Sequence, residues 1–242
     1  MKTASIIIIG NEILSGRTKD TNSNYLAKIL VEKGISLEEV RVIPDDHSII
    51  ESVVRNESNT KDYVFTSGGI GPTHDDITAE SIANCFDAPL AIREDAVKLL
   101  AMNYKNGKKD LNAARLRMAR IPEGAKLIEN KISGAPGFII KNVFVMAGVP
   151  QIFEAMVKEI ISDIRSGNPI VSKTVKIFKK ESEISNRIWN YAERYKDISI
   201  GSYPFNVSGV FGVEIVLRHT DRSLLNKVSN EILRDFNEPN TS

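Results

Sequence analysis

The chain has 242 residues, of which 42% are hydrophobic and 26% charged, a composition typical of a globular protein with one large domain or a large and a small one. With 32 basic and 31 acidic residues, the formal net charge of +1 gives no electrostatic reason to expect a nucleic-acid partner. No run approaches the roughly 20 apolar residues that cross a bilayer, Cys85 is the single cysteine, and the start of the chain lacks a signal-peptide pattern. We therefore expect a cytoplasmic protein without disulfides or membrane association.

Three strand–loop–helix units open the chain. The predicted strands are Ser5–Ile9, Val40–Ile43 and Tyr63–Thr66, and the first is rich in isoleucine, as is typical of a strand covered on both faces. A helix with one apolar face follows each strand: the first stops near Gly34, the second includes Ile49–Val54, and the third runs to about Phe86. This order predicts an α/β sandwich with right-handed crossovers and a mostly parallel sheet.

Polar residues follow each of these strands, at the point where the strand ends. They are Asn11 and Glu12, Asp45 and Asp46, and the segment Gly68–Asp76. Because ligands of open α/β sheets bind outside the carboxyl ends of the strands, we expect the three loops to share one rim.

The segment Gly68–Asp76 carries the densest chemical signal. Glycines allow a positive φ and a close approach of the backbone to a ligand, and the following helix start favours a phosphate. The acidic pair Asp75 and Asp76 can hold a divalent cation that bridges to that phosphate. An alternative stays open, in which the glycines only make a tight connection and the aspartates form turns or caps. The spacing matches neither a Walker loop nor a dinucleotide-binding GxGxxG motif.

The remaining chain predicts two further groups of elements. The first comprises helices at 95–104 and 111–120, a hairpin of strands at 138–140 and 143–146, and a helix at 150–165. A boundary follows at Ser166–Pro169. The second comprises a strand at 170–178, a helix at 181–194, strands at 199–203 and 210–218, and a helix at 223–236, similar in order to a ferredoxin-like unit without its last strand. We therefore predict a domain at 1–166 and a small α+β domain at 167–242.

Several motifs in order resemble the CinA (competence/damage-inducible protein) family. Its first signature resembles Gly10–Gly16 with Asp20–Asn22, its second resembles Ser67–Glu80, and its third resembles Ile121–Ala125 with Asn130, Ala135–Phe138 and Gly148–Pro150. Three departures stand out: Ser67 replaces a usual Thr, Ala147 replaces the Pro of a Leu-Pro-Gly turn, and the family's pyridine-nucleotide deamidase domain has no counterpart in these 242 residues. Deamidation is therefore not expected of this chain.

The resemblance implies a three-layer αβα sandwich of the MoaB/Mog molybdopterin-binding type, which some FAD synthases also contain. It implies a phosphorylated ligand at the strand ends, either molybdopterin or a nucleotide diphosphate, and a homodimer or homotrimer. The two aspartates central to the cofactor-synthesis relatives correspond by motif to Asp76 and to Asp45 or Asp46. We expect ligand-binding residues at Asn11, Glu12, Asn22, Ser67, Gly68, Gly69, Gly71, Thr78 and Gly148.

The leading hypothesis is a metal-dependent pyrophosphatase that hydrolyses an ADP-ribose- or FAD-type substrate. Asp45, Asp75 and Asp76 would be catalytic, and Asp45, Asp46 and Asp76 would hold Mg²⁺ or a similar ion, which neutralises charge on the phosphate oxygens. The alternative is a non-catalytic module that binds molybdopterin or a nucleotide in molybdenum cofactor biosynthesis. His47 and His74 adjoin acidic pairs, but a transition-metal site there is the less favoured interpretation.

Overall fold

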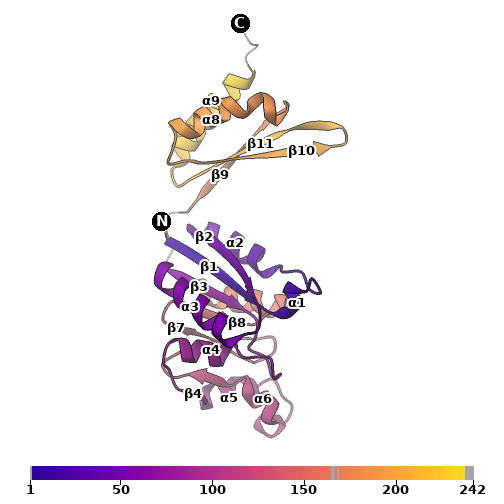
Figure 1. Cartoon of the computed structure of the whole chain (residues 1–242), viewed down its shortest axis with the longest axis vertical. Helices are drawn as coiled ribbons and strands as arrows, with labels where there is room; N and C mark the ends of the chain where they lie inside the picture. Colours follow the sequence, from indigo (N-terminus) through magenta and orange to yellow (C-terminus); the bar gives the residue numbers. More distant parts are fainter. Residues whose placement is uncertain (1, 165–166, 168, 238–242) are drawn as a thin grey trace. The chain divides into compact units, whose positions relative to one another are not determined.

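The computed structural model describes residues 2–164, 167 and 169–237, and its chain contacts divide into two compact units (Figure 1). The first unit is Met1–Gly167 and the second is Asn168–Ser242. Among the helices of the described residues, none combines the length and the hydrophobicity that a membrane span requires.

The first unit contains short strands and helices in alternation. Its strands are β1 (Lys2–Ile9), β2 (Ile35–Ile43), β3 (Tyr63–Ser67), β4 (Leu90–Ile92), β5 (Arg120–Pro122), β6 (Lys126–Ile128), β7 (Gly137–Ile140) and β8 (Val143–Met146). Its helices are α1 (Asn11–Leu14), α2 (Asn22–Glu32), α3 (His47–Thr60), α4 (Thr78–Cys85), α5 (Glu94–Ala101), the 3₁₀ turn η1 (Gly107–Asp110), α6 (Ala113–Arg117) and α7 (Pro150–Ile160).

Six of these strands form one sheet in the order β2-β1-β3-β8-β7-β6. The neighbours β2, β1, β3 and β8 run parallel, whereas β7 is antiparallel to both β8 and β6. The mostly parallel αβα sandwich predicted from the sequence is confirmed.

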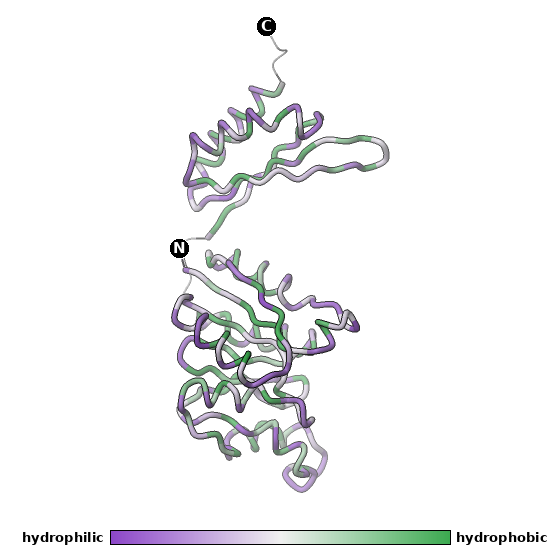
Figure 2. Tube along the Cα trace, in the orientation of Figure 1, coloured by the Kyte–Doolittle hydropathy of each residue, from purple (hydrophilic) through white to green (hydrophobic). Residues whose placement is uncertain are grey.

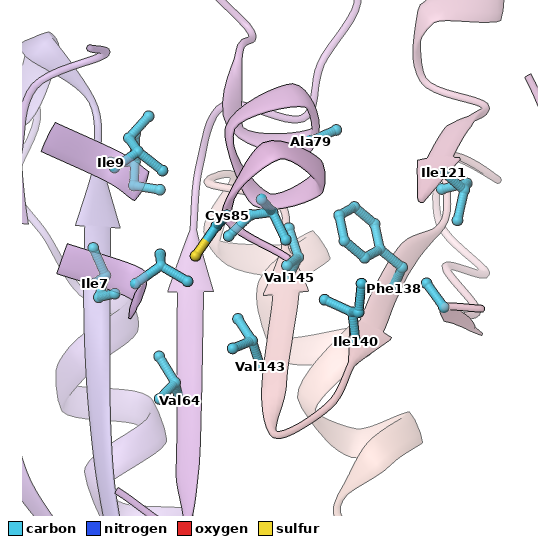
Figure 3. Packing of buried hydrophobic residues seen from close by; sticks show 14 of the residues in the cluster. Ile7, Ile9, Val64, Ala79, Cys85, Ile121, Phe138, Ile140, Val143 and Val145 are labelled. Atoms are coloured by element: carbon cyan, nitrogen blue, oxygen red, sulfur yellow. The ribbon is translucent and has the colours of Figure 1, made fainter. Parts of the chain in front are cut away.

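The buried end of β1 explains why the sheet needs helices on both faces. Ile7 and Ile9 belong to one hydrophobic core, with residues of α3 and α4, while Ile6 and Ile8 belong to another, with residues of α2 and α7. This alternation follows from side chains that point to opposite faces of a strand. The hydropathy colouring of Figure 2 marks the same hydrophobic run, and Figure 3 shows Ile7 and Ile9 on the face where Cys85 packs.

The structure differs from the sequence prediction in several elements. The short strands β4 and β5 pair with each other, and β6 forms the edge of the large sheet; none of the three was predicted. The helix predicted at 111–120 is the shorter α6, because Arg120 already belongs to β5, and the second strand begins at Ile35 rather than at Val40. The last helix of the unit ends at Ile160, and its predicted end at Arg165 lies outside the described residues.

The second unit has the strand–helix–strand–strand–helix order that the sequence predicted. Its elements are β9 (Val171–Ile177), α8 (Glu181–Arg194), β10 (Ser199–Val207), β11 (Val210–His219) and α9 (Arg222–Asn237), and its antiparallel sheet has the order β10-β11-β9. Alternate residues of β9 and β11, such as Val175 and Ile215, pack with Ile184 of α8 and Val228 of α9 in a separate hydrophobic core.

Candidate ligand-binding site

The carboxyl ends of the four parallel strands meet at one edge of the sheet, as expected for parallel neighbours. Two backbone hydrogen bonds join the loops to the adjacent strand ends: the Gly10 N–H donates to the Ile43 carbonyl (3.1 Å), and the Gly68 N–H donates to the Met146 carbonyl (3.1 Å). The predicted polar loops therefore lie along a common rim of the first unit.

The glycine loop after β3 requires glycine at two positions. Gly68 and Gly69 have φ values of 115° and 68°. A Cβ added at Gly68 would lie 2.1 Å from the carbonyl oxygen of Ile9, and one added at Gly69 would lie 2.1 Å from Oγ1 of Thr78. The loop thus packs directly on the end of β1 and on the first residue of α4, leaving no room for side chains.

Asp76 closes this loop with its carboxylate. Oδ1 accepts from the Gly71 N–H (2.7 Å), and Oδ2 accepts from the Thr73 N–H (2.7 Å) and from the Thr73 hydroxyl. Asp76 therefore does stabilise the turn, as one of the two interpretations of the acidic pair expected. Because a carboxylate has about four lone-pair sites, Oδ1 retains acceptor capacity for a further ligand.

The amide of Asn22 connects three segments of the rim. Its Nδ2 donates both to Oγ of Ser67, at the end of β3, and to the carbonyl of Gly148, after β8 (2.8 Å each). Asn22 and Ser67 are buried. The three residues also line a small cavity of about 40 Å³ beside the loop.

Asp45 carries a carboxylate that is partly buried and lies near other carboxylates. Its Oδ2 accepts from the Asn11 N–H (2.9 Å). Partial burial raises the pKa of Asp45, and the negative charges of Glu12, Asp75 and Asp76 raise it further, against the hydrogen bond from Asn11. A cation near Asp45 would relieve this repulsion.

The other expected site residues are used in different ways. Asp46 caps α3, because its Oδ1 accepts from the Ile49 N–H (3.0 Å) and the Ser48 hydroxyl (2.6 Å). Thr78 is fully buried beneath Gly69, and Asn11 contributes its backbone N–H to Asp45. Asp75 is exposed, with Oδ1 lying 3.9 Å from Nδ1 of His74.

A pocket of about 450 Å³ opens beside the glycine loop. Glu12, Gly68, Gly69, Gly71, Asp76 and Gly148 line it, and all six were expected from the sequence. The other residues that line the pocket were not expected at the site; they are Thr18, Ile70, Pro72, Met118, Asn130, Ser133, Ala135, Ala147, Val149, Pro150 and Ile152. The third motif could have indicated four of them, because it contains Asn130, Ala135, Val149 and Pro150. No motif contains Met118, Ser133 or Ile152, so no sequence signal indicated that they line the pocket.

The two histidines next to acidic pairs do not form a metal site with them. Nδ1 of His47 lies 2.8 Å from Oγ of Ser81, and the His74 side chain is 99% exposed. Within the described part of the chain, no group of three or more His, Cys, Asp or Glu side chains is arranged to hold a metal. Any ion at the rim would therefore be shared between one or two carboxylates and the ligand, as is common for Mg²⁺.

The fold and the pocket together define an α/β protein with a pocket at the carboxyl ends of parallel strands. Residues 5–166 match the family described as a probable molybdopterin binding domain, and residues 169–241 match the middle domain of FAD synthase. The chain belongs to the probable molybdopterin-binding family, as one of its CinA-like members.

Three similar proteins illustrate this relationship. A protein of Archaeoglobus fulgidus is 37% identical over 199 residues, covering 82% of this chain and 84% of that protein. A CinA protein of unknown function from Thermoplasma acidophilum, known from a crystal structure, is 37% identical in sequence. The two structures superpose with a TM-score of 0.62, and the match covers 67% of this chain and 98% of the solved chain. A probable FAD synthase of Caenorhabditis elegans is 32% identical over 227 residues, covering 84% of this chain and 44% of that protein.

Proposed function

We propose that this protein binds a phosphorylated nucleotide or pterin in the 450 Å³ pocket and hydrolyses a nucleotide diphosphate of the ADP-ribose or FAD type. The observation that carries the proposal is the side-by-side arrangement of the glycine loop and the carboxylates of Glu12 and Asp76 in one pocket, with Asp45 near them. Backbone N–H groups in a positive-φ loop bind phosphate oxygens.

The carboxylates fit a hard divalent cation. Asp45 carries a carboxylate with a raised pKa, and Asp76 keeps acceptor capacity on its loop-facing oxygen. These two residues would hold the ion, whereas Asp46 fits less well because it caps α3. When bound, the ion supplies charge neutralisation on the phosphate oxygens.

The protein groups then have separate tasks. Gly69 places its backbone N–H at the phosphate, since the N–H of Gly71 already donates to Asp76. The Glu12 carboxylate, which lines the pocket, orients a water molecule. The water oxygen forms a bond to one phosphorus, its proton passes to a carboxylate, and the bond from that phosphorus to the bridging oxygen breaks. The products are two monophosphates.

The test is incubation of the folded protein with ADP-ribose, FAD and related diphosphates plus Mg²⁺ or Mn²⁺, with separation of the monophosphate products. Asp45→Asn is the informative variant, because an Asn oxygen can still accept from the Asn11 N–H. We expect turnover by the wild type and at least about a hundredfold loss in the variant. Asp163→Asn, at an exposed ion pair with Lys126, is the control and should retain activity. Absence of turnover with every diphosphate would exclude hydrolysis.

A second function is favoured by the way Asp76 is used. Its carboxylate is already engaged by the loop, and no three-residue metal set is present among the described residues. Both observations suit a module that binds molybdopterin or a nucleotide without cleaving it. Saturable binding measured by calorimetry, with unchanged ligand recovered afterwards, would support this function over hydrolysis.

A further inference from the structure

The charged residues that line the 450 Å³ pocket are acidic. Within the described part of the chain they are Glu12 and Asp76. Two further carboxylates are near, because Asp45 experiences the charges of Glu12, Asp75 and Asp76. A phosphorylated ligand that enters the pocket therefore meets like charge, which opposes its binding unless a cation offsets it. A metal ion is one such cation, and a basic side chain beside the pocket is another.

A small cavity of about 10 Å³ adjoins the pocket. Several residues line both spaces, namely Ile70, Gly71, Asp76 and Met118. The small cavity is also lined by two arginines, Arg117 at the end of α6 and Arg120 at the start of β5. The two guanidinium groups therefore lie next to the glycine loop, although neither arginine lines the larger pocket itself.

Arg117 leaves most of its hydrogen-bonding capacity unused. Its guanidinium donates from Nη2 to the carbonyl oxygen of Asp76 over a long 3.4 Å. Its Nε is buried without a hydrogen-bond partner, and among the described residues no carboxylate forms an ion pair with it. Because a guanidinium presents a planar fork of N–H donors that suits phosphate oxygens, this side chain has the chemistry of an anion-binding group.

The neighbouring arginines are committed to other partners. Nη1 of Arg120 lies 3.8 Å from Oε2 of Glu80, although its Nε is also buried without a partner. Arg115, which precedes Arg117 on α6, has its guanidinium 4.4 Å from the centroid of the Tyr104 ring and lines neither space. Of the three, Arg117 is the one with neither a counter-ion nor a ring partner.

We propose that Arg117 is the specificity residue that favours an anionic, phosphorylated ligand, because it supplies positive charge beside the acidic pocket. The inference rests on the proposed function for the class of ligand and adds the residue that selects this class by charge. The effect does not require direct contact, since a unit charge acts over several ångströms where the effective dielectric constant is well below that of water. The hydrogen bond to the Asp76 carbonyl keeps the guanidinium at the loop that lines the pocket.

The first test removes this charge and restores it. Methylenediphosphonate and the α,β-methylene analogue of ADP-ribose, in which carbon replaces the bridging oxygen so that water cannot cleave there, are titrated into the full chain by calorimetry with Mg²⁺. Arg117→Gln should weaken binding of both ligands by at least about tenfold, whereas Arg117→Lys keeps the charge and should stay within about threefold of the wild type. Arg115→Gln, on the same helix, is the matched control and should change neither Kd. An unchanged Kd in Arg117→Gln, or a wild type that binds neither ligand, overturns the proposal.

The second test separates the charge of Arg117 from a purely structural role, such as its hydrogen bond to the Asp76 carbonyl. The Kd of methylenediphosphonate is measured between about 50 and 500 mM NaCl, and it should rise more steeply for the wild type than for Arg117→Gln, because salt screens the lost interaction. If Arg117→Gln fails to fold, Arg117→Met takes its place, since its unbranched side chain can pack where the arginine stem does. Equal salt dependence of the wild type and the folded variant contradicts a role of charge.

Neither test measures cleavage, so this inference and the hydrolysis proposed above can fail separately. A protein that shows the charge effect of Arg117 but cleaves no diphosphate would contradict hydrolysis and support the role of Arg117. A protein that cleaves ADP-ribose, and whose Arg117→Gln variant binds the methylene analogue as tightly as the wild type, would support hydrolysis and overturn the role of Arg117.

Discussion

The side chain of Asn22 shows how one buried residue can hold a ligand site together. Its amide spans the ends of β3 and β8 through Ser67 and Gly148, and it reinforces the backbone hydrogen bond from the Gly68 N–H to the Met146 carbonyl. Asn22 was expected to bind ligand, and the structure gives it this bridging position in addition. Its contribution to stability can therefore be measured without any ligand.

Asn22→Ala should lower the free energy of unfolding by about 2–4 kcal/mol, because it leaves the buried Ser67 hydroxyl and the Gly148 carbonyl without their donor. Urea denaturation followed by circular dichroism measures the change. Asn24→Ala, at an exposed position on the same helix, should remain within about 0.5 kcal/mol of the wild type. Equal stabilities of the two variants would show that the Asn22 bridge contributes nothing.

The neighbours Asp45 and Asp46 should respond to pH with opposite signs. Burial and nearby carboxylates raise the pKa of Asp45, whereas the Ser48 hydroxyl and the Ile49 N–H lower the pKa of Asp46. A raised pKa in the folded state means that the ionised group reduces stability, and this loss develops as the pH rises through the folded pKa. A lowered pKa contributes stability that is present above the unfolded pKa and is lost as the pH falls through the folded one.

Asp45→Asn should therefore raise the urea midpoint near neutral pH, and Asp46→Asn should lower it. The Asp45 effect should shrink as the pH falls through the raised pKa of the wild-type carboxyl, which then takes up its proton. The Asp46 effect should shrink only at lower pH, as the pH falls through the lowered pKa of that carboxyl. The midpoints of the wild type and both variants at each pH provide the measurement, and a destabilised Asp45→Asn near neutral pH would contradict the assigned burial and repulsion.

The pocket residues that could be predicted from the sequence are those that come from one continuous segment. Gly68, Gly69, Gly71 and Asp76 lie within one short segment, so their spacing alone indicated the loop. Met118 and Ile152 reach the same pocket from distant segments, where nothing in their local patterns distinguishes them from core residues. Their role depends on tertiary contacts, which a single sequence does not display.

Among the elements, the long and strongly patterned ones were predictable and the short ones were not. Continuous apolar runs identified β1 and β3, which are buried on both faces, and amphipathic faces identified α2 and α3, whose burial is periodic. The three-residue strands β4 and β5 exist because residues 90–92 and 120–122 pair with each other, and that pairing is decided by the folded chain. The same reasoning explains β6, which is defined by its pairing with β7.

The loop between β3 and α4 offers a test of its own geometry. Gly69→Ala combines a left-handed φ with a Cβ that would lie 2.1 Å from Thr78 Oγ1, so we expect a loss of about 2–5 kcal/mol in unfolding free energy. Gly16→Ala has a similar φ of 73° but no atom within 4 Å of the added Cβ, so its loss should be about 1 kcal/mol. Chemical denaturation of both variants separates the contact from the backbone strain. Equal losses would mean that the loop moves away from α4 without cost.

At the scale of the whole molecule, the pocket and the second unit are separable. Every residue that lines the 450 Å³ pocket belongs to the first unit. The second unit has its own core, and its match to the middle domain of FAD synthase sets it apart from the first. The solved CinA chain of Thermoplasma acidophilum matches 67% of this chain over 98% of its own length. That solved chain therefore folds without a counterpart of the other third of this chain.

Removal of the second unit should therefore leave the pocket intact. We expect a chain of residues 1–167 to unfold cooperatively and to bind ADP-ribose with a Kd within about threefold of the full chain, because no pocket residue is lost. Calorimetry with both proteins gives the comparison, and the 1–167 chain carrying Met118→Ala provides the control that binding still uses the same pocket. A folded 1–167 chain whose affinity falls by tenfold or more would show that the second unit contributes to the site, either directly or through assembly of several chains.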